Sequence, residues 1–174
     1  MAAYANSMKL RSPPLPRPFR IVLVEPEIPP NTGNVARLCA ATASPLHLVG
    51  KLGFRVDARA VRRAGLDYWH LVEVHRHDDL AGFREAFPEA RLRLFTANVS
   101  RSYLALDLQP GDALVFGRES VGLPRELVDA HPEAVAAIPT LGPVRSLNVA
   151  NAAAVVVYEA LRRTGALKTT FEGE

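Results

Sequence analysis

Short apolar runs alternate with longer amphipathic stretches from residue 20 onward. Continuous runs such as IVLV at 21–24 and ALVF at 113–116 are typical of strands covered on both faces of a sheet. The pattern predicts strands over residues 21–25, 46–50, 70–74, 91–96, 113–117 and 134–139, and helices over residues 33–42, 57–66, 78–87, 124–130 and 148–163. Because strands and helices alternate, we predict an α/β fold with a mostly parallel sheet and flanking helices.

The chain of 174 residues has an ordinary length for one domain. Residues 1–18 hold four of the 14 prolines and show no hydrophobic periodicity. We therefore predict an extended N-terminal arm over residues 1–18, a single domain over residues 19–165 and a short tail over residues 166–174.

The last predicted helix has almost no polar face, because alanines and valines fill most of residues 149–157. A helix that is apolar all round is buried all round. In so small a protein this predicts contact with more than one layer, and a second subunit is the simplest source of that contact. The pattern thus favours a homodimer.

Composition excludes several classes of protein. With 48% hydrophobic and 22% charged residues, the chain is not disordered in composition. The longest apolar run, residues 152–158, is far shorter than the roughly 20 residues of a membrane helix. A single cysteine, Cys39, leaves no intrachain disulfide and no multi-cysteine zinc site. Because the N-terminus also lacks an apolar signal, we expect a soluble cytoplasmic protein without a membrane partner.

The net charge is only +3, but 18 of the 21 basic residues are arginine. Arginine binds phosphate in a bidentate manner and stacks on bases, so the skew favours a nucleic acid or nucleotide ligand. The codon preference of a GC-rich genome would produce the same skew. The sequence contains neither the glycine-rich fingerprint of a Rossmann site after the first strand nor a P-loop.

The first segment rich in polar groups is EPEIPPNTGNVARLCA, residues 25–40. Its two prolines are expected to stop the strand, and Asn31 or Thr32 to cap the next helix. Asn34 and Arg37 lie one turn apart and could grip a phosphate or a sugar. The same pattern also fits a solvated helix face.

The second segment is VFGRESVGLP, residues 115–124, in which Gly117 ends a buried strand. The carboxylate of Glu119 could accept hydrogen bonds from ribose hydroxyls or an amine. Alternatively, Glu119 pairs with Arg118 or Arg125 at the surface.

The third segment is IPTLGPVRSLNVANA, residues 138–152. Ser146 or Asn148 is a suitable cap for the last helix. Equally, the backbone N–H groups of this loop could hold an adenine edge or a carboxylate.

Taken together, PNTGNVARLCA, FGRESVGLP and IPTLGPVRSLNVANAAAVVVYEA resemble the three motifs of the SPOUT methyltransferases, in order and spacing, over about residues 20–163. The stretch RRAGLDYW at 62–69 and the short length make the chain most similar to the TrmL subgroup. Its members are tRNA (cytidine/uridine-2′-O-)-methyltransferases that act on the wobble nucleotide of the anticodon loop. The resemblance implies a SPOUT fold with a C-terminal trefoil knot, an obligate homodimer and S-adenosylmethionine as the cofactor.

The resemblance also implies roles for individual residues. Arg37 corresponds to the catalytic arginine, Asn31 helps to hold it, and Asn148 supports the ribose site. The cofactor would be held by Phe95, Gly117, Ile138, Ser146 and Leu147. Arginines beside the inferred site, among them Arg55, Arg59, Arg62, Arg63 and Arg145, would bind the tRNA anticodon stem-loop, with Tyr68 and Trp69 as a stacking surface. Alternatively, the two aromatic residues belong to the core and the arginines pair with local acids.

A guanidinium, with a pKa above about 12, is a poor general base. We therefore expect Arg37 to fix the adjoining phosphate and polarise the 2′-hydroxyl during in-line attack on the methyl group. No metal is expected, because the run HRHD at residues 75–78 offers no clear third ligand and no cysteine. Two alternatives remain: a 2′-O-methyltransferase for another RNA such as ribosomal RNA, and a catalytically silent RNA-binding dimer on the same fold.

Overall fold

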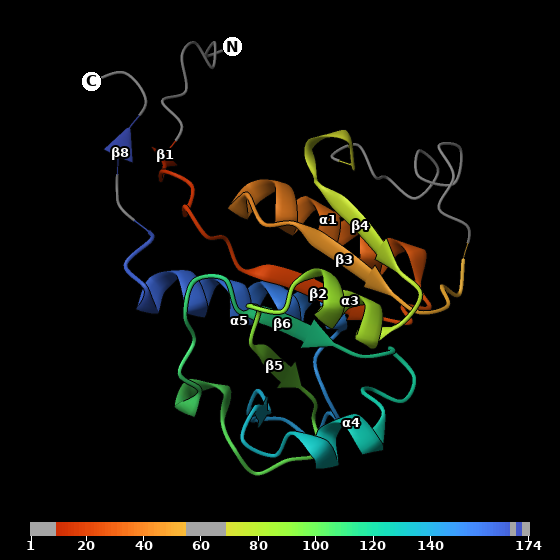
Figure 1. Ribbon diagram of the computed structural model, residues 1–174. Helices are drawn as coiled ribbons and strands as arrows, with labels where there is room; N and C mark the ends of the chain where they lie inside the picture. Colours follow the sequence, from red (N-terminus) through yellow and green to blue (C-terminus); the bar gives the residue numbers. More distant parts are fainter. Residues whose placement is uncertain (1–9, 55–68, 168–169, 172–174) are drawn as a thin grey trace, which may run out of the picture.

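The computed structural model describes residues 10–54, 69–167 and 170–171. These residues form a parallel six-stranded sheet in the order β4-β3-β2-β6-β5-β7, with helices packed against it (Figure 1). The strands are β2 (Arg20–Val24), β3 (Leu46–Val49), β4 (Val74–His77), β5 (Leu92–Phe95), β6 (Ala113–Phe116) and β7 (Val135–Ala136). The helices are α1 (Pro29–Thr42), α3 (Leu80–Ala86), α4 (Arg125–Ala130) and α5 (Val149–Arg163), with short 3-10 turns η1 (Trp69–Leu71) and η2 (Tyr103–Ala105). The predicted α/β class is confirmed.

The continuous apolar strands are buried because helices cover both faces of the sheet. Ile21 and Leu23 of β2 pack into one cluster with α1 and α5. Val22 and Val24, which point to the other face, pack into a second cluster with Phe83 of α3 and side chains of α4. Side chains alternate along a strand, so a strand with two covered faces must be apolar at every position.

The predicted strand over residues 70–74 is wrong. Residues 69–71 form the turn η1, and the strand β4 begins at Val74, where it pairs with Leu46 of β3. The strand was missed because its sequence is VHRH. Its two histidine rings, His75 and His77, stack on the buried His47 of β3. These contacts replace the aliphatic packing on which the apolar pattern relies.

The first helix begins earlier than predicted, at Pro29 rather than at residue 33. Pro29 and Pro30 occupy its first two positions, where a missing N–H costs nothing and the fixed φ suits the helix. The prolines therefore start the helix as well as end the loop. The expected caps are also wrong, since the N-cap residue is Ile28, and Asn31 and Thr32 are buried inside the first turn.

The last helix, α5, matches its predicted position, and the Asn148 side chain caps it by accepting a hydrogen bond from Ala150 N at 2.9 Å. The expectation that it is buried all round is wrong for the single chain. One face packs against α1 and β6, but Val155 and Tyr158 are 38% and 45% exposed.

The two ends of the described chain lie side by side (Figure 1), where β1 (Leu10–Arg11) pairs antiparallel with β8 (Thr170–Phe171). The division into arm, domain and tail stays a prediction. The helix predicted over residues 57–66 lies outside the described residues. Of the helices described, none has the length and apolar character needed to cross a bilayer.

Candidate functional site

A cleft of about 540 Å³ opens at the carboxyl ends of β5, β6 and β7, beside the first turns of α1 and α5. Ligands of open α/β sheets bind at this edge. Eight of the residues implied by the family resemblance line this one cleft: Asn31, Phe95, Gly117, Ile138, Arg145, Ser146, Leu147 and Asn148. The fold thus brings the three sequence motifs together, although the roles of these residues stay predictions.

Of the expected site residues that the structure describes, one does not line the cleft. Arg37 is exposed on α1, outside the cleft lining. Arg62 and Arg63 lie outside the described residues, as do Arg55, Arg59 and Tyr68. Trp69 is partly buried and packs against the core, as the alternative interpretation predicted.

A tight hairpin, residues 117–122, forms one wall of the cleft. Arg118 N donates to Gly122 O at 3.1 Å, and Gly122 N donates back to Arg118 O at 2.9 Å. A Cβ atom on Gly117 would lie 2.1 Å from the backbone carbon of Gly122, and Gly122 itself has φ +77°. Only glycine at these two positions permits so close an approach.

Glu119, near the tip of this hairpin, points across to the start of α1. One carboxylate oxygen accepts a hydrogen bond from Glu27 N at 2.9 Å. The other accepts from Ile28 N at 3.2 Å and from Asn31 Nδ2 at 3.0 Å. Since α1 has no acidic residue in its own first turn, Glu119 supplies negative charge at the positive end of the helix dipole.

The surface pairing considered for Glu119 is therefore wrong. Arg118 pairs with Glu25 instead, and Arg125 pairs with Asp129 one turn along α4. Sequence reasoning could weigh the carboxylate of Glu119 but not its partners, which lie about 90 residues away.

Two amide side chains continue the chain of hydrogen bonds from Glu119. Asn31 Oδ1 accepts from Asn148 Nδ2 at 2.9 Å, and Asn148 Oδ1 caps α5. Because an ionised carboxylate only accepts hydrogen bonds, Glu119 fixes the orientation of the Asn31 amide, which in turn fixes that of Asn148. The Glu119–Asn31–Asn148 chain joins all three motifs at the cleft.

The floor of the cleft is aromatic and apolar. The rings of Phe95 and Phe116 stack with their centroids 5.1 Å apart, and both side chains are buried. Residues 145–148 also line the cleft; they are exposed and include Arg145 as their cation. Sequence reasoning missed Phe116, because an aromatic residue inside a buried strand looks like ordinary core. An apolar floor with a few fixed polar groups is typical of a small-molecule site.

The histidines of β3 and β4 form a separate cluster. His47 is fully buried, and its ring stacks on those of His75 and His77 at centroid distances of 4.7 and 5.3 Å. Desolvation, with the nearby His75, His77 and Arg20 charges, lowers the pKa of His47 to about 3. His47 Nδ1 and His77 Nε2 face each other at 3.1 Å. Within the described ranges no group of acids, histidines or cysteines is arranged to hold a metal ion.

A match to a known protein family agrees with this parallel sheet and its cleft. The SpoU rRNA Methylase family matches residues 18–158. The chain therefore belongs to the SpoU methylase family. This result confirms the family resemblance drawn from the three motifs.

Two individual relatives are similar to this chain over most of its length. A protein of Escherichia coli (strain K12) named tRNA (cytidine(34)-2′-O)-methyltransferase is 48% identical over 148 residues, covering 84% of this chain and 94% of its own. A solved structure described as "Structural insights into the 2-OH methylation of C/U34 on tRNA" superposes with a TM-score of 0.78 at 46% identity, covering 85% of this chain and 97% of that one.

A third relative, an AdoMet-bound rRNA methyltransferase from Sinorhizobium meliloti, superposes with a TM-score of 0.73 at 27% identity. The match covers 86% of this chain but only 58% of that one. The shared part therefore corresponds to nearly the whole of the present chain.

Proposed function

We propose that this protein transfers a methyl group from S-adenosylmethionine to the ribose 2′-hydroxyl of nucleotide 34, the wobble position of the tRNA anticodon loop. The observation that carries the proposal is the convergence of the three motif segments on one cleft, at the edge of the sheet where α/β folds bind ligands. Relatives that match nearly end to end and carry this activity in their names support the choice of substrate.

The residues of the cleft fit the cofactor. Its volume of about 540 Å³ lies within the usual range for small-molecule sites. Phe95, Ile138 and Leu147 offer apolar surface for an adenine ring, while Gly117 and Ser146 leave backbone groups accessible. When bound, the cofactor supplies a methyl group on a sulfonium, which is already a good leaving group. The protein's own task is therefore orientation of the acceptor and stabilisation of the developing alkoxide.

The Glu119–Asn31–Asn148 chain gives that orientation a physical basis. The amides of Asn31 and Asn148 are held by hydrogen bonds of 2.9 to 3.0 Å to other groups of the protein. Groups that are already ordered do not have to be reorganised when the reaction occurs. Arg37 would fix the phosphate beside the target ribose and polarise its hydroxyl, with the proton leaving to phosphate or water.

We also propose that the protein acts as a homodimer in the cytoplasm. Val155 and Tyr158 form an exposed apolar face on α5, and α1, which carries Arg37, packs beside that helix. A second copy on this face would cover the apolar side chains. Arg145, which lines the cleft, would contact the anticodon stem-loop, and Arg62 and Arg63 are expected to do the same. The trefoil knot is likewise expected from the family.

The decisive experiment incubates the purified protein with methyl-labelled S-adenosylmethionine and either total tRNA or ribosomal RNA. Mass spectrometry then locates the label. We expect label on the ribose of nucleotide 34 in tRNA, and its loss in an Arg37→Ala variant. Label in ribosomal RNA alone, or on a base, would overturn the proposal. An absence of any transfer, together with retained tRNA binding, would favour the silent RNA-binding dimer.

A further inference from the structure

The two loops that flank the cleft hold each other by reciprocal hydrogen bonds. In the β2–α1 loop, residues 25–28, the side chain of Glu27 accepts hydrogen bonds from the hairpin. One Glu27 oxygen accepts from Ser120 Oγ at 2.9 Å, and the other accepts from Ser120 N at 3.0 Å. In return, the hairpin's Glu119 accepts from Glu27 N. Each loop thus offers a carboxylate to a backbone N–H of the other, an arrangement called here the interlock.

The interlock is part of a longer series of contacts between the hairpin and the β2–α1 loop. Three consecutive hairpin residues, Arg118, Glu119 and Ser120, all reach the β2–α1 loop. The acceptor of Arg118 is Glu25, whose φ of +48° lies in the left-handed region. A non-glycine residue in that region is strained and persists only where its surroundings hold it.

The turn after β3 leaves room for both acids of the loop. A Cβ atom on Gly50, which has φ +81°, would lie 2.7 Å from Glu25 Cγ. A Cβ atom on Gly53 would lie 2.9 Å from Glu27 Cα. Glycine at these two positions therefore lets the loop approach the hairpin as closely as the interlock requires.

Glu27 does not line the cleft; Ser120 does, and its hydroxyl donates to Glu27. Their contacts instead determine where Glu119 lies, because Glu119 immediately precedes Ser120. We propose that Glu27 and Ser120 are positioning residues for the methyl-transfer site, which hold the hairpin at the distance where Glu119 can orient Asn31 and Asn148. This inference rests on the proposed function.

The chemistry of the pair predicts how each variant behaves. The hydroxyl and the backbone N–H of Ser120 hold the pKa of Glu27 below its ordinary value, so the pair is charge-assisted at neutral pH. Glu27→Gln keeps the size of the side chain but turns an amide NH2 toward one of the two donors. Ser120→Ala removes only the hydroxyl bond, whereas Ser120→Thr keeps it.

A hairpin that is released part of the time lowers the population of the binding-competent cleft. The apparent Kd of a ligand then rises by the inverse of that population. Once the ligand is bound, the hairpin is back in place and the chemical step is unaffected. The expected signature is a higher Kd and KM for S-adenosylmethionine with nearly unchanged kcat, which general destabilisation would not produce.

The test measures S-adenosylmethionine binding by calorimetry, and steady-state methyl transfer to tRNA, with the full-length chain. We expect Kd and KM to rise about fivefold to tenfold in Glu27→Gln and about threefold in Ser120→Ala, while kcat changes less than twofold. Ser120→Thr should bind the cofactor as wild type does. The double variant Glu27→Gln/Ser120→Ala should bind it with the same Kd as Glu27→Gln alone, because both changes remove the same contact. Glu85→Gln, an exposed change on α3, is the matched control.

The outcomes separate this inference from the proposed function. If wild type methylates tRNA but Glu27→Gln, folded by circular dichroism, binds the cofactor as wild type does, the inference alone fails. It also fails if Ser120→Thr is as weak as Ser120→Ala, or if kcat falls while KM is unchanged. If wild type binds the cofactor without methylating tRNA, the proposed function fails. The Kd values of the variants for S-adenosylmethionine then still show whether the interlock positions the cleft. A wild type that binds no S-adenosylmethionine overturns both.

Discussion

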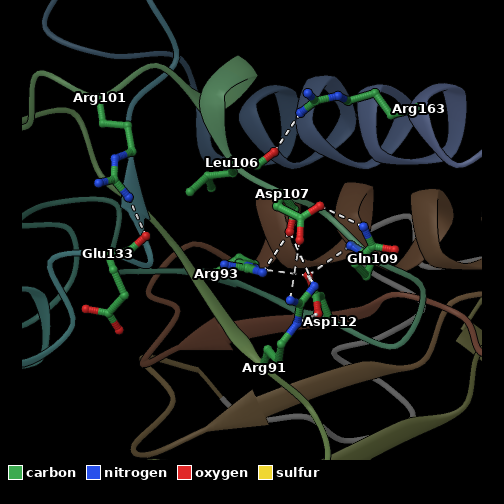
Figure 2. Close-up of polar contacts among 9 residues, drawn as sticks. All are labelled: Arg91, Arg93, Arg101, Leu106, Asp107, Gln109, Asp112, Glu133 and Arg163. Carbon is green, nitrogen blue, oxygen red and sulfur yellow. Dashed lines mark hydrogen bonds and ion pairs between the residues drawn. The ribbon is translucent and has the colours of Figure 1, made fainter.

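Two carboxylates at opposite ends of the same sheet each gather several hydrogen bonds, yet their surroundings differ. Asp112, at the amino ends of β5 and β6, is buried and accepts from Arg91, Arg93 and the backbone of Gln109 at 2.8 to 3.0 Å (Figure 2). Glu119, at the carboxyl ends, accepts from two backbone groups and one amide, and it borders the cleft.

The difference lies in what surrounds each carboxylate. The guanidinium groups of Arg91 and Arg93 hold Asp112 (Figure 2). Arg163 of α5 donates to the carbonyl of Leu106, and Arg101 donates to that of Glu133 (Figure 2). Glu119 is held by neutral groups, and it borders the cleft of about 540 Å³, one wall of which is the hairpin with Gly117 and Gly122. A dense polar network therefore does not by itself mark a functional site. The adjoining cavity and the ordered amides beside it are what distinguish the carboxyl end.

Replacing Asp112 should produce the largest loss of stability. Asp112→Ala leaves the largely buried Arg93 guanidinium without its carboxylate partner, and we expect a loss of about 3 kcal/mol in unfolding free energy. Urea denaturation measures the loss. Methyl transfer per folded molecule should stay within about twofold of wild type. A large fall in kcat/KM with unchanged stability would reverse the roles given to the two ends of the sheet.

Glu119→Gln should have the opposite profile. The NH2 group of glutamine must face a donor that the carboxylate now accepts from, so the Asn31 and Asn148 amides lose their fixed orientation. We expect kcat/KM for methyl transfer to fall about 30-fold, and unfolding free energy to fall by less than about 1 kcal/mol. Parallel kinetics and urea denaturation check both values. Normal activity in a destabilised variant would make Glu119 a structural residue like Asp112.

Acid should weaken a third region, the histidine cluster of β3 and β4, in which His47 is buried. Because the pKa of His47 is lowered from 6.5 to about 3, the folded state binds fewer protons than the unfolded state between these values. Stability is therefore full above pH 6.5 and is lost as pH falls through that window. Between pH 7 and pH 5 the expected loss is about 2 kcal/mol.

Urea denaturation at the two pH values measures this loss, with His47→Leu as the comparison. The variant has no titrating group at this position, so its stability should fall less between pH 7 and pH 5. An equal fall in both proteins would assign the acid sensitivity to other groups, such as the carboxylates at the two ends of the sheet.

The smallest effect is expected for Arg125, the residue once considered as a partner of Glu119. It pairs with Asp129 at 3.2 Å, but the two side chains are 89% and 61% exposed. Exposed pairs of this kind contribute about 0.3 to 0.5 kcal/mol. Arg125→Ala should leave both kcat/KM and cofactor affinity unchanged. A clear loss of activity in this variant would show that the α4 surface takes part in binding.

Sequence patterns predicted most of the fold. Five of the six predicted strands share two or more residues with observed strands, because a strand covered on both faces must carry a continuous apolar run. The sixth, residues 70–74, shares only Val74 with β4. The exception, β4, is held by stacked histidines, which no apolar pattern detects. The start of α1 was misjudged for a different reason. Proline both breaks strands and starts helices, and the local sequence did not say which role applied.

The sequence by itself determined the α/β class and the positions of most strands and helices, and its resemblance to a known family pointed to eight residues that line one cleft. These properties follow from local periodicity and from motifs of a few residues. Only the tertiary structure decided that Glu119 reaches Asn31 across 88 residues, and that Asn148 reaches it across 117. The reason is physical: β2 and β6 pair in parallel, so the loops at their carboxyl ends meet only after the sheet has formed.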